Sequence, residues 1–294
     1  MKNILIGITF AILWSSASVA TKFGVLSASP LLVANSRFFI AGIILLTFSY
    51  IYFRDKSYRL PTKSEFIQLT IFGILNTSVY LGLYVYAMKY TAAGIGSLAV
   101  STNPLIIALL SGWLINRVPS SREWAGIALS MFGIAIATYP LLQNQTTTLL
   151  GVLLLSLSMV SVSFASVYYS KITWELPNLL INGWQVLIGG LFLLPFTIAF
   201  SDFSNSKFDT TFCLSVLWLS IGVSIFGLIC WFYLLKIDTI KASLWLFLCP
   251  LFGFFFAWLL MDEPITVFTI LGTILVLAGL FLGQKKVAKS ATSD

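Results

Sequence analysis

Ten apolar runs of about 20 residues follow one another along the chain, and no other feature limits its folding as strongly. A helix of about 20 apolar residues crosses the roughly 30 Å hydrocarbon core of a bilayer. Strands of a membrane barrel would be shorter and would alternate in polarity, so helices are expected. We therefore predict an all-α membrane protein with ten transmembrane helices. The predicted spans cover residues 4–26, 31–53, 66–88, 92–115, 124–142, 149–169, 179–200, 212–235, 242–261 and 267–283.

Charged residues make up 9% of this 294-residue chain, whereas a soluble domain carries about 25%. So few charges cannot cover a water-facing surface. This excludes a soluble enzyme, a disordered chain and a nucleic-acid binder, despite the net charge of +7. Histidine is absent and the three cysteines lie far apart, so we expect neither a metal site nor a cofactor.

The basic residues predict the orientation in the membrane. With the N-terminus inside, 13 of the 17 Lys and Arg residues fall on the inner side. Because basic residues are enriched in cytoplasmic loops, both termini are expected in the cytoplasm. Ser18-Val19-Ala20 after Lys2 also resembles a signal-peptide cleavage site. The apolar run continues past Ala20, which favours a retained first span.

The sequence contains an internal repeat. Three residues of the fourth and fifth spans recur 146 residues later in the ninth and tenth: Pro104, Gly126 and Gly133 correspond to Pro250, Gly272 and Gly279. The repeat divides the chain into halves 1–145 and 146–294. Five spans per half is an odd number, so the second half is predicted to be inverted in the membrane. Inverted repeats are typical of secondary transporters, whose substrate site lies at the repeat interface near the midplane.

Four sequence patterns, in this order and spacing, resemble the EamA-type branch of the drug/metabolite transporter superfamily. They are Trp14-Ser15 before Lys22, Pro30 before Arg37-Phe38, Ala87-Met88-Lys89-Tyr90-Thr91-Ala92-Ala93 before Pro104, and Pro250 before Asp262-Glu263-Pro264. The chain departs from the family pattern at Ser15, where Gly is usual, and at Arg117, where Glu is frequent. The resemblance implies ten helices, a central cavity, export of small metabolites or drugs, and fifth and tenth helices that lie away from the cavity.

Pro104 and Pro250 lie near the middle of their predicted spans. Each removes a backbone N–H and leaves the carbonyl of Val100 or Leu246 without its helical partner. Their matched placement favours a hinge that lines a cavity. The alternative is a packing kink, since proline is common in membrane helices.

Aromatic and small polar residues predict the cavity wall. Asn76, Tyr80 and Tyr84 are spaced to share one face of the third helix, and lipid offers Asn76 no hydrogen-bond partner. Trp14 and Ser18 align similarly in the first helix, as do Ser224 and Trp231 in the eighth. Three further residues beside the prolines complete the substrate-binding candidates: Ser101, Asn103 and Trp245. Such a wall suits apolar or aromatic solutes, whereas Tyr and Trp near span ends would be interface anchors.

Arg37 lies about two turns into the second span. Its side chain could snorkel to the membrane surface, or it could face the cavity mouth and steer a carboxylate. All ten acidic residues fall in connectors, span ends or the tail, so no midplane carboxylate is available to couple transport to protons. Facilitated export is therefore favoured over tightly coupled antiport.

Taken together, these patterns predict an exporter of small metabolites in the cytoplasmic membrane, with amino acids or aromatic compounds as its substrates. A multidrug or purine/nucleoside efflux transporter is the alternative within transport. A non-transporting membrane scaffold is the alternative outside it. A membrane enzyme is disfavoured, because it needs a nucleophile with a base, a metal set or paired carboxylates within the membrane. The expected partners are a small-molecule substrate and the lipid bilayer, and both a monomer and a homodimer are compatible with the sequence.

Overall fold

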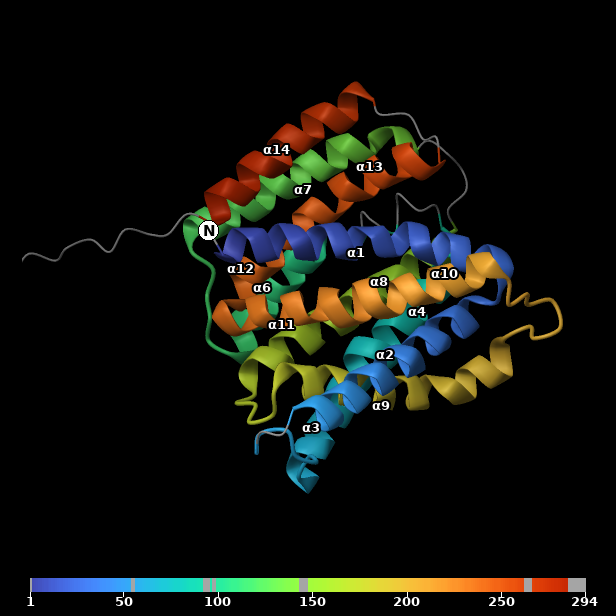
Figure 1. Ribbon diagram of the computed structural model, residues 1–294. Coiled ribbons are helices and arrows are strands. Elements are labelled where there is room, and N and C mark those ends of the chain that lie inside the picture. The colour runs from blue at the N-terminus through green and yellow to red at the C-terminus, as the bar shows by residue number, and fades with distance from the viewer. Residues whose placement is uncertain are drawn as a thin grey trace, which may run out of the picture.

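The computed structural model describes residues 2–53, 56–91, 96, 99–142, 148–261 and 266–284, and every regular element in these ranges is helical (Figure 1). Two segments are π-helical, η1 (Ile74–Val79) and η2 (Leu219–Gly227), and η3 (Trp245–Leu248) is a 3-10 helix. The α-helices are α1 (Lys2–Ser27), α2 (Pro30–Tyr52), α3 (Lys63–Gly73), α4 (Tyr80–Ala87), α6 (Asn103–Leu114), α7 (Ser121–Leu142), α8 (Leu149–Lys171), α9 (Asn178–Phe200), α10 (Thr210–Trp218), α11 (Leu228–Ile237), α12 (Thr239–Leu244), α13 (Cys249–Met261) and α14 (Val267–Gln284).

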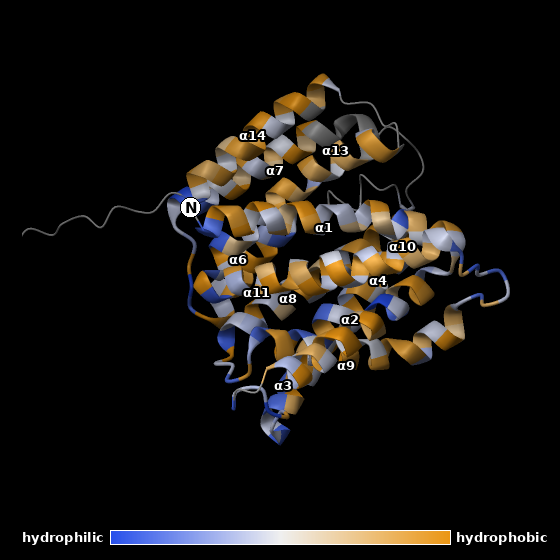
Figure 2. Cartoon of the chain, viewed as in Figure 1, coloured by the Kyte–Doolittle hydropathy of each residue, from blue (hydrophilic) through white to orange (hydrophobic). Residues whose placement is uncertain are grey.

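Seven helical stretches in the described part of the chain are long and apolar enough to cross a membrane. They include three composite stretches, Lys63–Ala87, Thr210–Ile237 and Thr239–Leu260, which continue through η1, η2 and η3. Hydrophobic residues cover much of the helix surfaces, and hydrophilic residues gather in the connectors (Figure 2). The prediction of an all-α membrane protein is confirmed. The count of ten spans and the inversion of the repeat stay predictions.

Helix α1 occupies the centre of the bundle. It packs against α10, η2 and α11 on one side and against α13 on the other (Figure 1). Helix α2 pairs with α9, and α4 and α6 both pack on α8. Helix α7 pairs with α14 at one edge of the bundle, as the resemblance implied for the fifth and tenth spans. The central helices can therefore surround a site that the α7–α14 pair does not enter.

The connectors gather at two ends of the bundle, in the grouping that the charge pattern predicted. Arg117 and Asp238, from two connectors predicted to be cytoplasmic, approach to 2.9 Å. At the other end, Ser27 donates a hydrogen bond to Asp209 at 3.1 Å. The chain thus crosses between these ends repeatedly, as a multi-pass membrane protein does. Which end faces the cytoplasm stays a prediction.

Pro104 lies in the first turn of a helix, whereas Pro250 lies within the continuous helical stretch Thr239–Leu260, directly after its 3-10 turn. Pro104 is the second residue of α6, after a turn at residues 101–102, and residues 92–95 and 97–98 of its predicted span lie outside the described ranges. Pro250 is the second residue of α13, directly after η3. In the first turn of α6, a backbone N–H at position 104 would have no helical acceptor, so Pro104 removes no helical hydrogen bond. The Leu246 carbonyl accepts the N–H of Cys249 instead of remaining unpaired. The role of hinge stays a prediction.

Glycines bring α7 and α14 into backbone contact in a reciprocal pattern. A Cβ added at Gly126 would lie 2.6 Å from the carbonyl oxygen of Gly279, and one added at Gly133 would lie 2.7 Å from that of Gly272. Between these contacts, Ser130 of α7 donates a hydrogen bond to a carbonyl of α14 at 3.3 Å. The acceptor is Val276, the residue 146 positions after Ser130. Gly126 thus meets the repeat counterpart of Gly133, Gly133 meets the counterpart of Gly126, and Ser130 meets its own counterpart. A two-fold axis between the two helices produces this pattern.

Candidate substrate cavity

A narrow cavity lies among α1, α2, α4, η2 and α13. Five predicted residues line it: Trp14, Ser18, Arg37, Tyr80 and Tyr84. Val223 and Cys249 contribute from the second half of the chain. The volume of the cavity is about 30 Å³. The cavity therefore holds little more than water in this conformation. A metabolite needs the surrounding helices to move apart.

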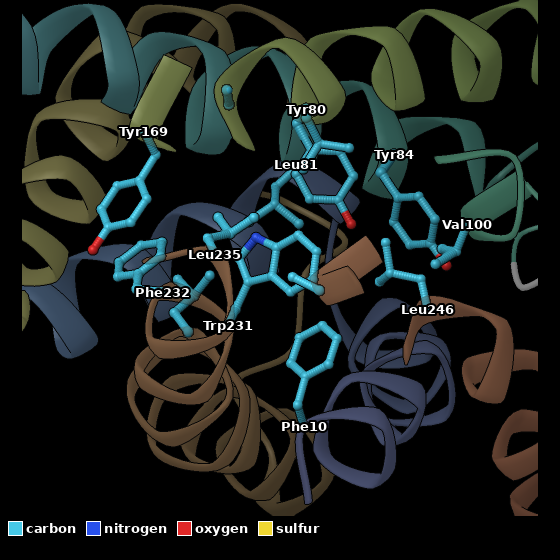
Figure 3. Close-up of a cluster of buried hydrophobic side chains, with 14 of the residues drawn as sticks. Phe10, Tyr80, Leu81, Tyr84, Val100, Tyr169, Trp231, Phe232, Leu235 and Leu246 are labelled. Atoms are coloured by element: carbon cyan, nitrogen blue, oxygen red, sulfur yellow. The ribbon is translucent and has the colours of Figure 1, made fainter. Parts of the chain in front are cut away.

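The cavity has an aromatic wall. Tyr80 and Tyr84 project side by side from α4, with ring centroids 6.1 Å apart, toward Trp231 and Leu246 (Figure 3). Trp231 lies behind the lining and stacks on Phe10 with centroids 4.9 Å apart. Phe10 in turn packs against Trp14 at 5.4 Å. Phe10 was not among the predicted residues, because a phenylalanine in an apolar helix carries no sequence signal of its neighbours.

Arg37 is buried beside this wall, with 2% of its surface exposed. Its Nε and Nη2 atoms donate hydrogen bonds to the hydroxyl of Ser224 at 3.2 and 3.0 Å. Ser220 donates to the Arg37 carbonyl at 3.2 Å. Of the two predicted alternatives, snorkelling is wrong and the cavity-facing cation fits. In the described ranges, no carboxylate forms an ion pair with this guanidinium.

A chain of buried amides extends from Ser224 to η1. Asn182 of α9 donates to the Ser224 carbonyl at 2.8 Å, and Gln185 donates to Asn182 at 3.1 Å. Gln185 accepts hydrogen bonds from Asn76 at 3.3 Å and from Thr77 at 2.7 Å. The predicted residue Asn76 therefore holds this network and does not line the cavity. In the apolar interior, such a network fixes the position of Ser224 and hence of Arg37.

The two π-helical segments explain why Asn76 leaves the predicted face. A π-helix bonds each residue to the one five positions away, so positions i, i+4 and i+8 no longer align. Segments η1 and η2 occupy equivalent points of the third and eighth predicted spans, and η2 supplies Ser220, Val223 and Ser224. Such segments occur frequently at functional sites. The 3.6-residue periodicity used for the prediction cannot detect them.

The three candidates beside the prolines lie outside the cavity lining. Ser101 is buried at the turn before α6, and Asn103 accepts a hydrogen bond from Ser163 at 3.2 Å. Trp245 packs on Gly7, where a Cβ would overlap the indole ring. Their direct role in substrate binding stays a prediction.

Among the described residues that line the cavity, none carries a carboxylate. Within the described residues, no group of three or more Cys, Asp or Glu side chains could hold a metal ion. Asp262 and Glu263, part of the sequence resemblance, lie outside the described residues. The chemistry available at the cavity is therefore one guanidinium, several hydroxyls, one thiol and aromatic surface. This arrangement can bind a solute.

Comparison with known proteins identifies similar chains. The sequence model of the EamA-like transporter family matches residues 1–139 and again residues 149–283. "Uncharacterized transporter YoaV" of Bacillus subtilis is 27% identical, with 96% of this chain and 97% of that protein covered. "Uncharacterized inner membrane transporter YedA" of Escherichia coli is 27% identical over 79% of this chain and 74% of its own. A solved crystal structure matches with a TM-score of 0.79 at 19% identity, covering 96% of this chain and 97% of its own, which shows a shared fold.

Proposed function

Since the chain belongs to the EamA-like transporter family, we propose that this membrane transporter exports small metabolites, such as amino acids or aromatic compounds, by alternating access. The observation that carries the proposal is the buried cavity, which takes its lining from both halves of the chain. Secondary transporters place their substrate site between repeats in this way. The narrowness of the cavity also fits a conformation in which the site is closed.

Two independent observations support two inverted five-helix repeats, 1–145 and 146–294. The family sequence model matches once in each half. The reciprocal contacts between α7 and α14 relate Gly126, Ser130 and Gly133 to α14 as a two-fold axis in the membrane plane would. The turn before Pro104 and the 3-10 segment before Pro250 fit the irregular helices that line transporter sites. These features favour ten spans with both termini in the cytoplasm.

The proposed location is the cytoplasmic membrane, because the Escherichia coli relative is named as an inner membrane transporter. The solute partner is a small molecule held by the aromatic wall and Arg37. No cofactor enters the proposal, and neither nucleic-acid binding nor an enzymatic reaction is part of it. The transporter reading is compatible with a monomer or a homodimer.

Flux through purified protein in liposomes tests the proposal. Liposomes loaded with a panel of labelled amino acids, aromatic acids, purines and cationic dyes should release one class faster than protein-free liposomes. Tyr84→Ala should reduce that flux at least tenfold, because it removes part of the cavity wall. Ser158→Ala is the matched control, since Ser158 is buried in α8 and bonds only within its own helix.

The outcome of the panel also separates the alternatives. Release of cationic dyes or purines alone would replace metabolite export with multidrug or purine efflux. Release of no compound by well-folded protein would favour a non-transporting scaffold and would reject the proposal.

A further inference from the structure

The charge of Arg37 lacks an acidic partner in the described part of the chain. A guanidinium carries five N–H donors, and the bonds to Ser224 engage only Nε and Nη2. The hydroxyl of Ser224 is neutral and its backbone carbonyl is occupied by Asn182. Burying a cation without an anion is strongly unfavourable in an apolar interior. The site is therefore electrostatically incomplete.

The groups around Arg37 indicate which ligand would balance its charge. The groups that face it across the cavity are the Tyr80 and Tyr84 hydroxyls and the Cys249 thiol, together with the indole of Trp14. None of them offers a full negative charge at neutral pH. We propose that Arg37 binds the carboxylate of a small organic acid or amino acid, whose apolar or aromatic body lies along the Trp14 and Tyr84 side of the cavity. A planar guanidinium suits a carboxylate because it can donate two parallel hydrogen bonds. This inference rests on the proposed function and names its substrate class.

Paired ligands that differ only in charge test this inference. Binding of phenylacetate and of phenylacetamide to the purified protein is measured by quenching of tryptophan fluorescence. The wild type should bind the carboxylate at least tenfold more tightly than the amide. Arg37→Gln should lose this preference while retaining weak binding of both ligands. Ser158→Ala should retain the preference.

Arg37→Lys is a second variant that controls for misfolding, because it keeps the buried positive charge. Its ammonium group cannot donate the two parallel hydrogen bonds that a guanidinium donates to a carboxylate. This variant should retain only part of the preference. Equal binding of both ligands by the wild type, or an unchanged preference in either Arg37 variant, would overturn the anion site. The flux panel tests the proposed function separately. If neutral or cationic solutes are transported and carboxylates are not, the protein is a transporter but the proposed anion site is rejected.

A second inference comes from a motif that the cavity does not use. Segments 59–65 and 117–123 share the pattern Arg-x-Pro-Thr/Ser-x-x-Glu, and we call them the clasp segments. In both, the arginine pairs with the glutamate at 2.7 Å, and the backbone N–H of the Thr or Ser donates to that glutamate at 2.7 Å. The glutamate hydrogen bond raises the pKa of Arg59 above its ordinary value. Each clasp segment therefore presents a fixed arginine just before a helix, α3 or α7.

Each clasp arginine also reaches an acid in the other half of the chain. Arg59 pairs with Glu175 at 3.0 Å, and Arg117 pairs with Asp238 at 2.9 Å. Every ion pair in the described ranges belongs to these two clusters, and both join connectors predicted to be cytoplasmic. The Arg117 and Asp238 side chains are 32% and 21% exposed. Partly exposed pairs are individually weak, so they can break and re-form during a transport cycle.

The geometry points to a two-part gate, in which Arg59–Glu175 and Arg117–Asp238 hold the two halves together at this end while the cavity is closed. Breaking both links should shift the population toward a conformation open at the clasp end, since these contacts exist only while that end is shut. This inference also rests on the proposed function, and its readout is conformational.

Cys249 provides a native reporter for this gate because it lines the cavity and is 3% exposed. Cys213→Ser and Cys230→Ala leave it as the single cysteine. An impermeant maleimide added at the clasp end should label Cys249 at least threefold faster when Glu175→Gln and Asp238→Asn are combined. Asparagine at position 238 keeps the helix cap that Asp238 gives α12, so only the charge is lost.

Asp202→Asn is the matched control, since Asp202 is an acid at the opposite end. It should leave labelling of Cys249 unchanged. Unchanged labelling in the double variant would overturn the gate. Faster labelling from both ends would also overturn it, because a general loosening gives that result. Flux is recorded separately, so failure of the gate and failure of transport are distinguishable.

Discussion

At the scale of single residues, packing around the central helix is so close that one methyl group decides stability. A Cβ at Gly7 of α1 would overlap the indole of Trp245, whereas no atom of the residues that the structure describes lies within 4 Å of a Cβ at Gly112 of α6. Gly7→Ala should lower the free energy of unfolding by about 1–3 kcal/mol, as overpacking does in other cores. Gly112→Ala should be neutral or stabilising by up to about 1 kcal/mol, because alanine favours helix. Thermal unfolding in detergent measures both, and equal effects of the two substitutions would contradict the packing argument.

Residue-scale inference from the sequence named several side chains that the structure brings to one cavity. Tyr80 was predicted there because it shares a helix face with Asn76 and Tyr84, and for Arg37 the cavity was one of two alternatives. Their role in binding stays a prediction. Asn182 and Gln185 are polar side chains in the seventh predicted span, and they were overlooked although they support Arg37. Phe10 could not be predicted, because its role depends on which rings the fold brings beside it.

At the scale of helices, the hydrophobic periodicity predicted where most helices lie. It did not predict the π-helical and 3-10 segments within them. The observed α1, α2, α8 and α9 agree with the predicted spans to within a few residues. The π-helical segments and the 3-10 segment before Pro250 were not predicted, because apolar sequence continues unchanged through them. Tertiary hydrogen bonds of these segments, such as that between Thr77 and Gln185, are not visible in the pattern of a single helix.

The α7–α14 contact leads to a prediction at this same scale. Gly126→Ala and Gly279→Ala would each push the two helix backbones apart, so each should destabilise the protein by about 1–3 kcal/mol. Because both substitutions open one contact, the double variant should be less destabilised than the sum of the single effects. A double-mutant cycle of unfolding free energies checks this, with Gly112→Ala as the reference helix substitution. Strict additivity would show that the two glycines do not share a contact. Flux per folded molecule should persist, since neither helix lines the cavity.

At the scale of the whole molecule, the grouping of connectors at two ends leads to a topology prediction. The distribution of Lys and Arg places the N-terminal end, with the clasp segments, in the cytoplasm. Reporter fusions at Gln143 and at Lys285 should therefore read outside and inside, respectively. Fusion at Ser206, in the connector between α9 and α10, should read outside and serves as an internal check. The same side for Gln143 and Lys285 would reject the ten-span arrangement with inverted halves.

Energy coupling is also a property of the whole molecule, because a coupled carrier must move an ion across the same site as its substrate. The described part of the cavity lining offers no carboxylate, histidine is absent from the chain, and the Arg37 guanidinium does not release its proton. No side chain at the site is therefore suited to release and take up a proton in each cycle. Flux in liposomes should run down the substrate gradient at the same rate with or without an imposed pH gradient. Arg37→Gln should reduce flux of carboxylates without creating any dependence on that gradient. Flux that stops when the pH gradient is collapsed with a protonophore would contradict facilitated export and would assign proton binding to a carboxylate outside the cavity.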